Sequence, residues 1–112
     1  MNQIFHITQS TVWEEAKSTG IYLGDTLESE GFIHCSTRSQ VVKVANRLFK
    51  NQHNLKLLCI IPSKVKPEIR YEALEGEEVF PHIYGALNID AVSEIIDFKP
   101  GEDGSFILPA NI

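Results

Sequence analysis

The run from Leu55 to Ile61 restricts the possible folds more than any other segment, because six of its seven residues are apolar. A strand that is apolar on both faces must be covered on both faces, so we expect it at the centre of a sheet. Pro62 ends the strand, since proline has no N–H to donate to a ladder. With 112 residues and a hydrophobic fraction of 43%, the chain has the size of a single domain, residues 1–112. It needs neither metal nor disulfide bonds to explain its folding.

Several shorter segments have the β-branched and aromatic composition that is typical of strands. The predicted strands are residues 3–7, 32–35, 69–74, 92–98 and a short terminal strand at 106–108. Residues 83–87 fit either a strand or a loop, and residues 89–92 fit a single helical turn. The strands are short and most of them lie in the second half of the chain.

The first of two predicted helices directly follows the N-terminal strand. Thr11 and Glu14 have the spacing of a capping box, and Gly20 is suited to end the helix. Val12 and Ala16 lie four residues apart and therefore share one face of this helix. Trp13 lies one step round the helix, where two roles are open: bordering the pocket or packing in the core.

The second predicted helix begins at Thr37, with Gln40 at the capping-box spacing. Apolar residues then recur at intervals of three and four: Val41, Val44, Ala45, Leu48 and Phe49. With about two helices and six or so short strands, the chain belongs to the α+β class.

The charge balance excludes one class of function. The chain has 10 basic and 15 acidic side chains, which gives a net charge of −5. Proteins that bind duplex nucleic acid usually present a basic face, so we do not expect duplex binding. A single pocket on an acidic protein can still be positive, so a small anionic ligand remains open.

Both cysteines, Cys35 and Cys59, lie in apolar runs and are expected to be buried and reduced, as in a cytoplasmic protein. The first residues lack the basic region and apolar stretch of a signal peptide. No apolar run approaches the roughly 18 residues that a bilayer-spanning helix needs. We therefore predict a cytoplasmic protein that does not enter a membrane.

Three histidines, His6, His34 and His82, lie inside short strand-like apolar runs. Each is followed by residues that carry a hydroxyl: Thr8 after the first, Ser36 and Thr37 after the second, and Tyr84 after the third. A buried imidazole needs partners for its ring nitrogens, so three of them would be a costly way to build a core. We expect at least two of the three to line one polar pocket.

His34 is the strongest single candidate, because Ser36 and Thr37 follow it where a strand ends and a helix begins. Two hydroxyls and the free backbone N–H groups of a helix start could hold an anion. The alternative is that both hydroxyls only cap the helix. Capping and ligand contact can also coexist.

The other polar candidates are less distinctive. His82 precedes Tyr84 in a loop-like setting, where a ring could be exposed for function. His53 lies in a polar turn and is expected to be solvated. Arg70 and Glu72 could supply charge to a pocket, yet charged residues near a strand edge are usually solvated.

Two other chemistries are disfavoured by spacing. The short histidine spacings of zinc sites are absent, so we expect no metal, and a zinc-dependent hydrolase is the least favoured alternative. Cys35 is adjacent to His34, but neighbours on a strand point to opposite faces and would not form a Cys–His pair. The glycine patterns of dinucleotide-binding folds and phosphate-binding loops are also absent.

The segments that carry a family likeness are Ile4-Phe5-His6-Ile7-Thr8, Trp13-Glu14, Glu30-Gly31-Phe32-Ile33-His34-Cys35-Ser36-Thr37, Val44-Ala45-Asn46-Arg47, Arg70-Tyr71-Glu72 and Phe80-Pro81-His82-Ile83-Tyr84-Gly85. In this order they resemble a bacterial family catalogued as domain of unknown function 952, and the likeness extends from about Ile4 to Phe98. The resemblance implies an ADP-ribosyltransferase-like fold, a split sandwich of two small, mostly antiparallel sheets around an NAD-binding cleft.

The resemblance also implies roles for individual residues. His6 would hold a ribose, His34 and Ser36 would line the nicotinamide side, and His82 with Tyr84 would lie near the third motif of that superfamily. Many of its transferases place a glutamate at this motif to stabilise an oxocarbenium-like state. Here the region offers only Glu77 and Glu78, in an acidic turn with no clear match.

We therefore expect an ADP-ribosyltransferase-like enzyme that binds NAD or a related nucleotide in a histidine-lined cleft. The expected catalytic residues are His34 and His82, and the expected ligand-binding residues are His6, Thr8, Ser36, Thr37 and Tyr84. The alternative, favoured by the missing glutamate, is a non-enzymatic module that binds a nucleotide or another metabolite.

Overall fold

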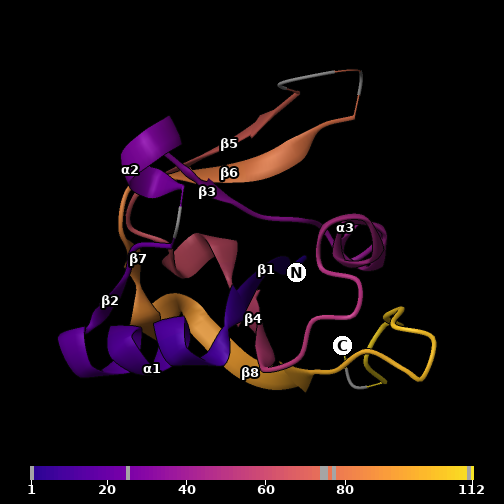
Figure 1. Ribbon diagram of the computed structural model, residues 1–112. Helices are drawn as coiled ribbons and strands as arrows, with labels where there is room; N and C mark the ends of the chain where they lie inside the picture. Colours follow the sequence, from indigo (N-terminus) through magenta and orange to yellow (C-terminus); the bar gives the residue numbers. More distant parts are fainter. Residues whose placement is uncertain (1, 25, 74–75, 77, 111) are drawn as a thin grey trace.

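The computed structural model describes residues 2–24, 26–73, 76, 78–110 and 112. Strands and α-helices alternate over residues 4–60, and strands predominate after that (Figure 1). The strands are β1 (Ile4–Gln9), β2 (Ile21–Tyr22), β3 (Ile33–His34), β4 (Leu55–Ile60), β5 (Glu68–Glu72), β6 (Phe80–Tyr84), β7 (Leu87–Asn88) and β8 (Val92–Phe98). The helices are α1 (Ser10–Thr19), α2 (Leu27–Glu30) and α3 (Val41–Leu48), with short 3-10 helices at Pro62–Lys64 and Ile89–Ala91.

The apolar strand β4 is the middle strand of a three-stranded antiparallel sheet in the order β1-β4-β8. The prediction of a central strand is therefore confirmed. Its side chains alternate between two separate cores: Leu58 and Ile60 pack with α1, whereas Leu55, Leu57 and Cys59 pack with α3. Both faces are covered because helices lie on opposite sides of this sheet.

A second three-stranded antiparallel sheet has the order β3-β6-β5, and β2 pairs with β7. Figure 1 shows β5 and β6 extending together away from α1. A single bridge between Phe5 and Ser36 links β1 to the segment after β3, with N–H···O distances of 2.8 Å in both directions. This bridge brings the two larger sheets side by side. The α+β class with small antiparallel sheets agrees with the prediction, and the described residues form three α-helices rather than about two.

The two faces of the β3-β6-β5 sheet differ in chemistry. Ile33 and Ile83 are fully buried in the core shared with α1, and Ile69 packs against the same core. The residues paired across the opposite face are His34, His82 and Arg70. Because side chains alternate along a strand, one face of this sheet builds the core and the other carries polar groups.

Several helix predictions were wrong in detail. Helix α1 begins at Ser10, and no side chain caps it, so the Thr11–Glu14 capping box does not form. Trp13 and Ala16 are its buried residues, while Val12 is 37% exposed. The predicted terminator Gly20 does end the helix, in the left-handed conformation that glycine favours.

At the second helix only half of the predicted capping box is present. The Gln40 side chain accepts a hydrogen bond from the Thr37 N–H (3.0 Å), and regular helix begins at Val41. Val41 and Ala45 are fully buried, but Leu48 is 58% exposed because it faces the cleft described below.

The C-terminal segment does not form the predicted strand at residues 106–108. Asn46 of α3 holds it instead: its Oδ1 accepts from the Phe106 N–H (2.6 Å), and its Nδ2 donates to the Phe106 carbonyl (3.3 Å). Phe106 is thereby held against Phe98, with ring centroids 4.7 Å apart. A side chain therefore supplies the hydrogen bonds that a neighbouring strand would otherwise supply.

Replacing Asn46 with alanine removes both bonds and leaves the backbone N–H of Phe106, a largely buried residue, without its partner. We expect the Asn46→Ala variant to lose about 1–3 kcal/mol of unfolding free energy. Urea unfolding measures this loss, with Gln52→Ala on the exposed turn as the control. A loss within about 0.5 kcal/mol, the range of ordinary surface substitutions, contradicts the role given to Asn46.

A histidine-lined candidate site

A cleft of about 920 Å³ lies where the two larger sheets meet, and His6, His34 and His82 all belong to its wall. They come from β1, β3 and β6. Helix α3 supplies further lining residues, including Val44, Arg47 and Leu48. Thr8 and Ser36 of the predicted site also line this cleft, whereas Thr37 and Tyr84 are outside its wall.

His6 belongs to a buried polar chain. Its Nδ1 donates to the main-chain carbonyl of His34, and its Nε2 lies 2.7 Å from the hydroxyl of Tyr22. That hydroxyl donates to Thr8 Oγ1 at 2.8 Å. His6, Thr8 and Tyr22 are 8%, 5% and 2% exposed, so these bonds are shielded from water. These hydrogen bonds join β1 to both β2 and β3.

His82 is held by a carboxylate. Its Nδ1 lies 3.0 Å from Glu72 Oε1 of the neighbouring strand β5. The Tyr84 hydroxyl donates to the same oxygen. These bonds, first that from Tyr84 and then that from His82, keep the pKa of Glu72 below its ordinary value. Glu72 is therefore a carboxylate at neutral pH.

His34 is the most accessible of the three histidines, with 43% of its side chain exposed. Its Nε2 lies 3.1 Å from Glu30 Oε2 at the end of α2. The ring centroids of His34 and His82 are 5.3 Å apart in an edge-to-face arrangement. The cleft thus has two imidazoles close together, each beside a glutamate.

Several main-chain donors at the predicted anion site, before and at the start of α3, bond partners within the protein. The N–H of Ser36 donates to Phe5, and that of Thr37 donates to the Gln40 side chain. Further along, the N–H groups of Gln40 and Val41 donate to the Thr37 carbonyl at 3.1 Å each. Local bridge and turn formation thus uses these four main-chain donors.

The cysteines and His53 behave as the sequence indicates. Cys35 and Cys59 are free and buried. Burial raises the pKa of both thiols, that of Cys59 to about 11 with a further contribution from Glu94, so neither is a thiolate at neutral pH. His53 is exposed in its turn.

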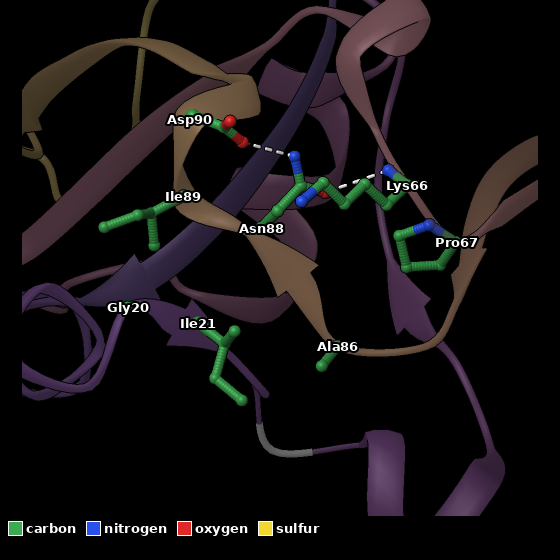
Figure 2. A pocket seen from close by; sticks show the side chains of 8 residues that line it. All are labelled: Gly20, Ile21, Lys66, Pro67, Ala86, Asn88, Ile89 and Asp90. Atoms are coloured by element: carbon green, nitrogen blue, oxygen red, sulfur yellow. Dashed lines mark hydrogen bonds between the residues drawn. The ribbon is translucent and has the colours of Figure 1, made fainter.

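A second pocket, of about 630 Å³, lies between β2, β7 and the segment before β5 (Figure 2). Asn88 is its main polar residue. The Asn88 side chain accepts from the Lys66 N–H (2.9 Å) and donates to the Lys64 carbonyl (2.9 Å) and to Asp90 Oδ1 (2.5 Å). The amide is thus committed to holding the loop together, which makes this pocket a weaker candidate than the histidine-lined cleft.

Two kinds of feature are absent from the part of the chain that the structure describes. No three or more histidine, cysteine, aspartate or glutamate side chains are placed there to hold a metal ion. None of the helices formed by those residues has the length and apolar character needed to cross a bilayer.

Comparison with known proteins places the chain in a family. The sequence profile of the family described as "Protein of unknown function (DUF952)" matches residues 7–95. The chain belongs to the DUF952 family. The expected family resemblance is thereby confirmed. No curated protein matches the chain.

Two solved structures of the Caulobacter crescentus protein CC0527 are similar to this DUF952 chain. The crystal structure has a TM-score of 0.87 at 31% identity, with 95% of this chain and 94% of CC0527 covered. The solution structure has a TM-score of 0.81 at 30% identity, with coverages of 98% and 96%. The fold is therefore shared across almost the whole length of both chains.

Three contributors to the site were missed or undervalued from sequence. Tyr22 lies in a two-residue strand, and no sequence pattern singled it out. Glu72 was taken as a solvated charge, although its alternation with Arg70 already placed both on one face. Glu30 lies on α2, a four-residue helix that was not predicted.

The Tyr22 hydroxyl contacts two buried partners and is a sensitive position to test. Tyr22→Phe keeps the ring and removes the hydrogen bonds to His6 and Thr8, each typically contributing about 0.5–1.5 kcal/mol. We expect a loss of about 1–3 kcal/mol in unfolding free energy, measured by urea unfolding. Tyr71→Phe, at a 56% exposed tyrosine, is the matched control. Equal stability of the two variants would show that the hydrogen bonds of the Tyr22 hydroxyl do not stabilise the protein.

Because folding lowers the pKa of Glu72, this residue should contribute to the free energy of unfolding in a pH-dependent way. A carboxyl whose pKa is lowered on folding stabilises the protein above its unfolded pKa, and this contribution is lost as the pH falls through the folded value. We expect Glu72→Gln to be less stable than the wild type at neutral pH, and the difference to shrink below about pH 4. Unfolding free energies across a pH series test this.

Tyr84→Phe provides a graded comparison, because the Tyr84 hydroxyl is the largest cause of the lowered pKa. This variant keeps the carboxylate, so its stability difference from the wild type should also narrow on acidification, though from a smaller starting value. Differences that stay constant from neutral to acidic pH in both variants would show that Glu72 is not stabilised as an anion.

Proposed function

We propose that the histidine-lined cleft binds NAD, ADP-ribose or a related phosphorylated nucleoside, and that the protein transfers or releases the ADP-ribosyl group. The observation that carries this proposal is the presence of His6, His34 and His82, from three strands, on the wall of one cleft. A volume of about 920 Å³ is within the usual range for pockets that bury small ligands. The ADP-ribosyltransferase-like fold implied by the sequence resemblance is part of the same proposal.

The charges around the cleft are compatible with a phosphorylated ligand. Arg47 is a cation of its wall, and Glu30 and Glu78 are its carboxylates. Lys43 compensates the charge of Glu78 at 2.7 Å. Arg47 is thus the natural contact for a diphosphate, since a guanidinium binds phosphate oxygens through paired donors.

The ring of His6 has a supporting role in this proposal. Both of its nitrogens have partners inside the protein, the His34 carbonyl and the Tyr22 hydroxyl. A ribose could gain a bond to His6 only by displacing one of them. The hydroxyls of Thr8 and Ser36, which also line the cleft, are the neighbouring groups suited to the sugar.

A non-enzymatic binding module is the second candidate, and the lining carboxylates favour it. Glu78 bonds Lys43 and Gln40, and Glu30 bonds His34. Glu77, the other residue of the acidic turn considered for the third motif, lies outside the described residues. Within the described chain, both carboxylates of the cleft wall are thus committed to protein partners.

Titration of labelled protein with NAD and then ADP-ribose, followed by NMR, tests binding. We expect saturable shifts at His34, Ser36 and His82. The His82→Gln variant should bind about 10- to 100-fold more weakly, because one hydrogen bond to a charged or polar ligand is lost. His53→Gln, at the exposed histidine, should bind like the wild type. Absence of saturable shifts at about millimolar ligand, an affinity near −4 kcal/mol, would exclude the nucleotide.

A further inference from the structure

The geometry around His82 determines which of its ring nitrogens carries the proton. Glu72 Oε1 lies 3.0 Å from Nδ1 and also accepts the Tyr84 hydroxyl. A carboxylate has no proton to donate, so Nδ1 must be the donor in this bond. In a neutral imidazole the second nitrogen, Nε2, is then an unprotonated base.

The unprotonated nitrogen reaches the cleft. His82 is only 2% exposed, yet it is part of the cleft wall. Within the described residues, the hydrogen-bond partner of the ring is Glu72, and no fully buried side-chain nitrogen or oxygen lacks a partner. Nε2 is therefore an accessible atom, and the cleft is the space it can reach.

The ring is also held against rotation. Phe32 packs on it with ring centroids 4.3 Å apart and an angle of 31°. The Arg70 guanidinium lies 4.4 Å from the centre of the Tyr84 ring, which helps to fix the phenol that bonds the carboxylate. A base whose partner and ring plane are both fixed needs little reorganisation before it accepts a proton.

We infer that Glu72 and Tyr84 are positioning residues that make His82 the general base for an oxygen acceptor, either a hydroxyl group or water. This inference rests on the proposed function. In the step, His82 Nε2 takes the proton of the acceptor O–H while its oxygen forms a bond to C1′ of the nicotinamide ribose. The C1′–N bond breaks, its electron pair goes to the pyridinium ring, and neutral nicotinamide leaves.

The acceptor class follows from what such a base can do. A carboxylate acceptor is already deprotonated and gains nothing from an imidazole. A guanidinium, with a pKa above about 12, holds its proton too strongly for an imidazole to remove it. A thiol is partly ionised near neutral pH by itself. An O–H acceptor gains most, because general-base catalysis removes its proton as the bond forms.

The tautomer is tested directly by long-range ¹H–¹⁵N correlation spectra of the histidine rings, recorded at mildly alkaline pH where an ordinary imidazole is neutral. We expect His82 to show a protonated Nδ1 in the wild type. In Glu72→Gln the amide can either accept or donate, so a mixture of tautomers is expected. Glu68→Gln, on the same strand and sheet face, should retain the wild-type pattern.

Catalysis is tested with NAD as the donor and with water or methanol as the acceptor, by measuring nicotinamide release and the formation of the methyl glycoside. His82→Gln should slow release by about 10²- to 10⁴-fold. Glu72→Gln should slow it by about 10- to 100-fold, as for partners that orient other functional imidazoles. In Glu72→Gln the value of kcat should fall while NAD affinity stays within about twofold of the wild-type value, because the carboxylate acts through His82.

The outcomes separate this inference from the proposed function. A protonated Nε2 in the wild type, or an unchanged tautomer in Glu72→Gln, overturns the positioning role even if NAD binds. NAD binding without nicotinamide release, or release that His82→Gln leaves unchanged, overturns the general base. Absence of NAD binding overturns the proposed function and the acceptor class with it, while the ring spectra still report the His82–Glu72 pair.

Discussion

The contact between the two larger sheets is the constraint on which the candidate site depends. Phe5 and Ser36 exchange backbone hydrogen bonds. The next residue of β1, His6, donates from Nδ1 to the carbonyl of His34, two residues before Ser36. Without this junction, the two sheets that carry β1 and β3 would not be held together, and their histidines would not face one cleft. With it, a polar wall forms at the seam, and α3 closes the other side of the cleft. The core and the site therefore rely on the same few backbone contacts.

The β3-β6-β5 sheet shows how one structure serves stability and chemistry together. Its inner face carries fully buried isoleucines such as Ile33 and Ile83. Its outer face carries His34, His82 and Arg70 in register. The rigid inner face fixes the backbone from which the polar side chains project, which limits the movement of the Glu72–His82 pair. The Glu72–His82 pair differs from a solvated surface ion pair, because its members come from neighbouring strands and the His82 side chain is only 3% exposed.

Predictions from sequence patterns were correct where the signal was local and strong. The strand at Val92–Phe98 has the predicted bounds, and Leu55–Ile60 is central as its apolar run indicated. Predictions failed where tertiary contacts replaced local signals. Phe106 has strand-like neighbours, but Asn46 holds its backbone and no strand forms. The exposed side of α3 includes Leu48, since a cleft rather than a core lies beside it.

By itself the sequence determined the α+β class, the central strand and the three histidines as candidate site residues. Each of these predictions depends only on composition or short-range periodicity. Only the tertiary structure decided which partner each histidine has. Glu72 of β5 contacts His82 of β6 because of the register in which these two strands pair, and Tyr22 contacts His6 from a strand of only two residues. Such pairings depend on strand order and sheet contact, which are set by burial over the whole chain and leave no trace in local spacing.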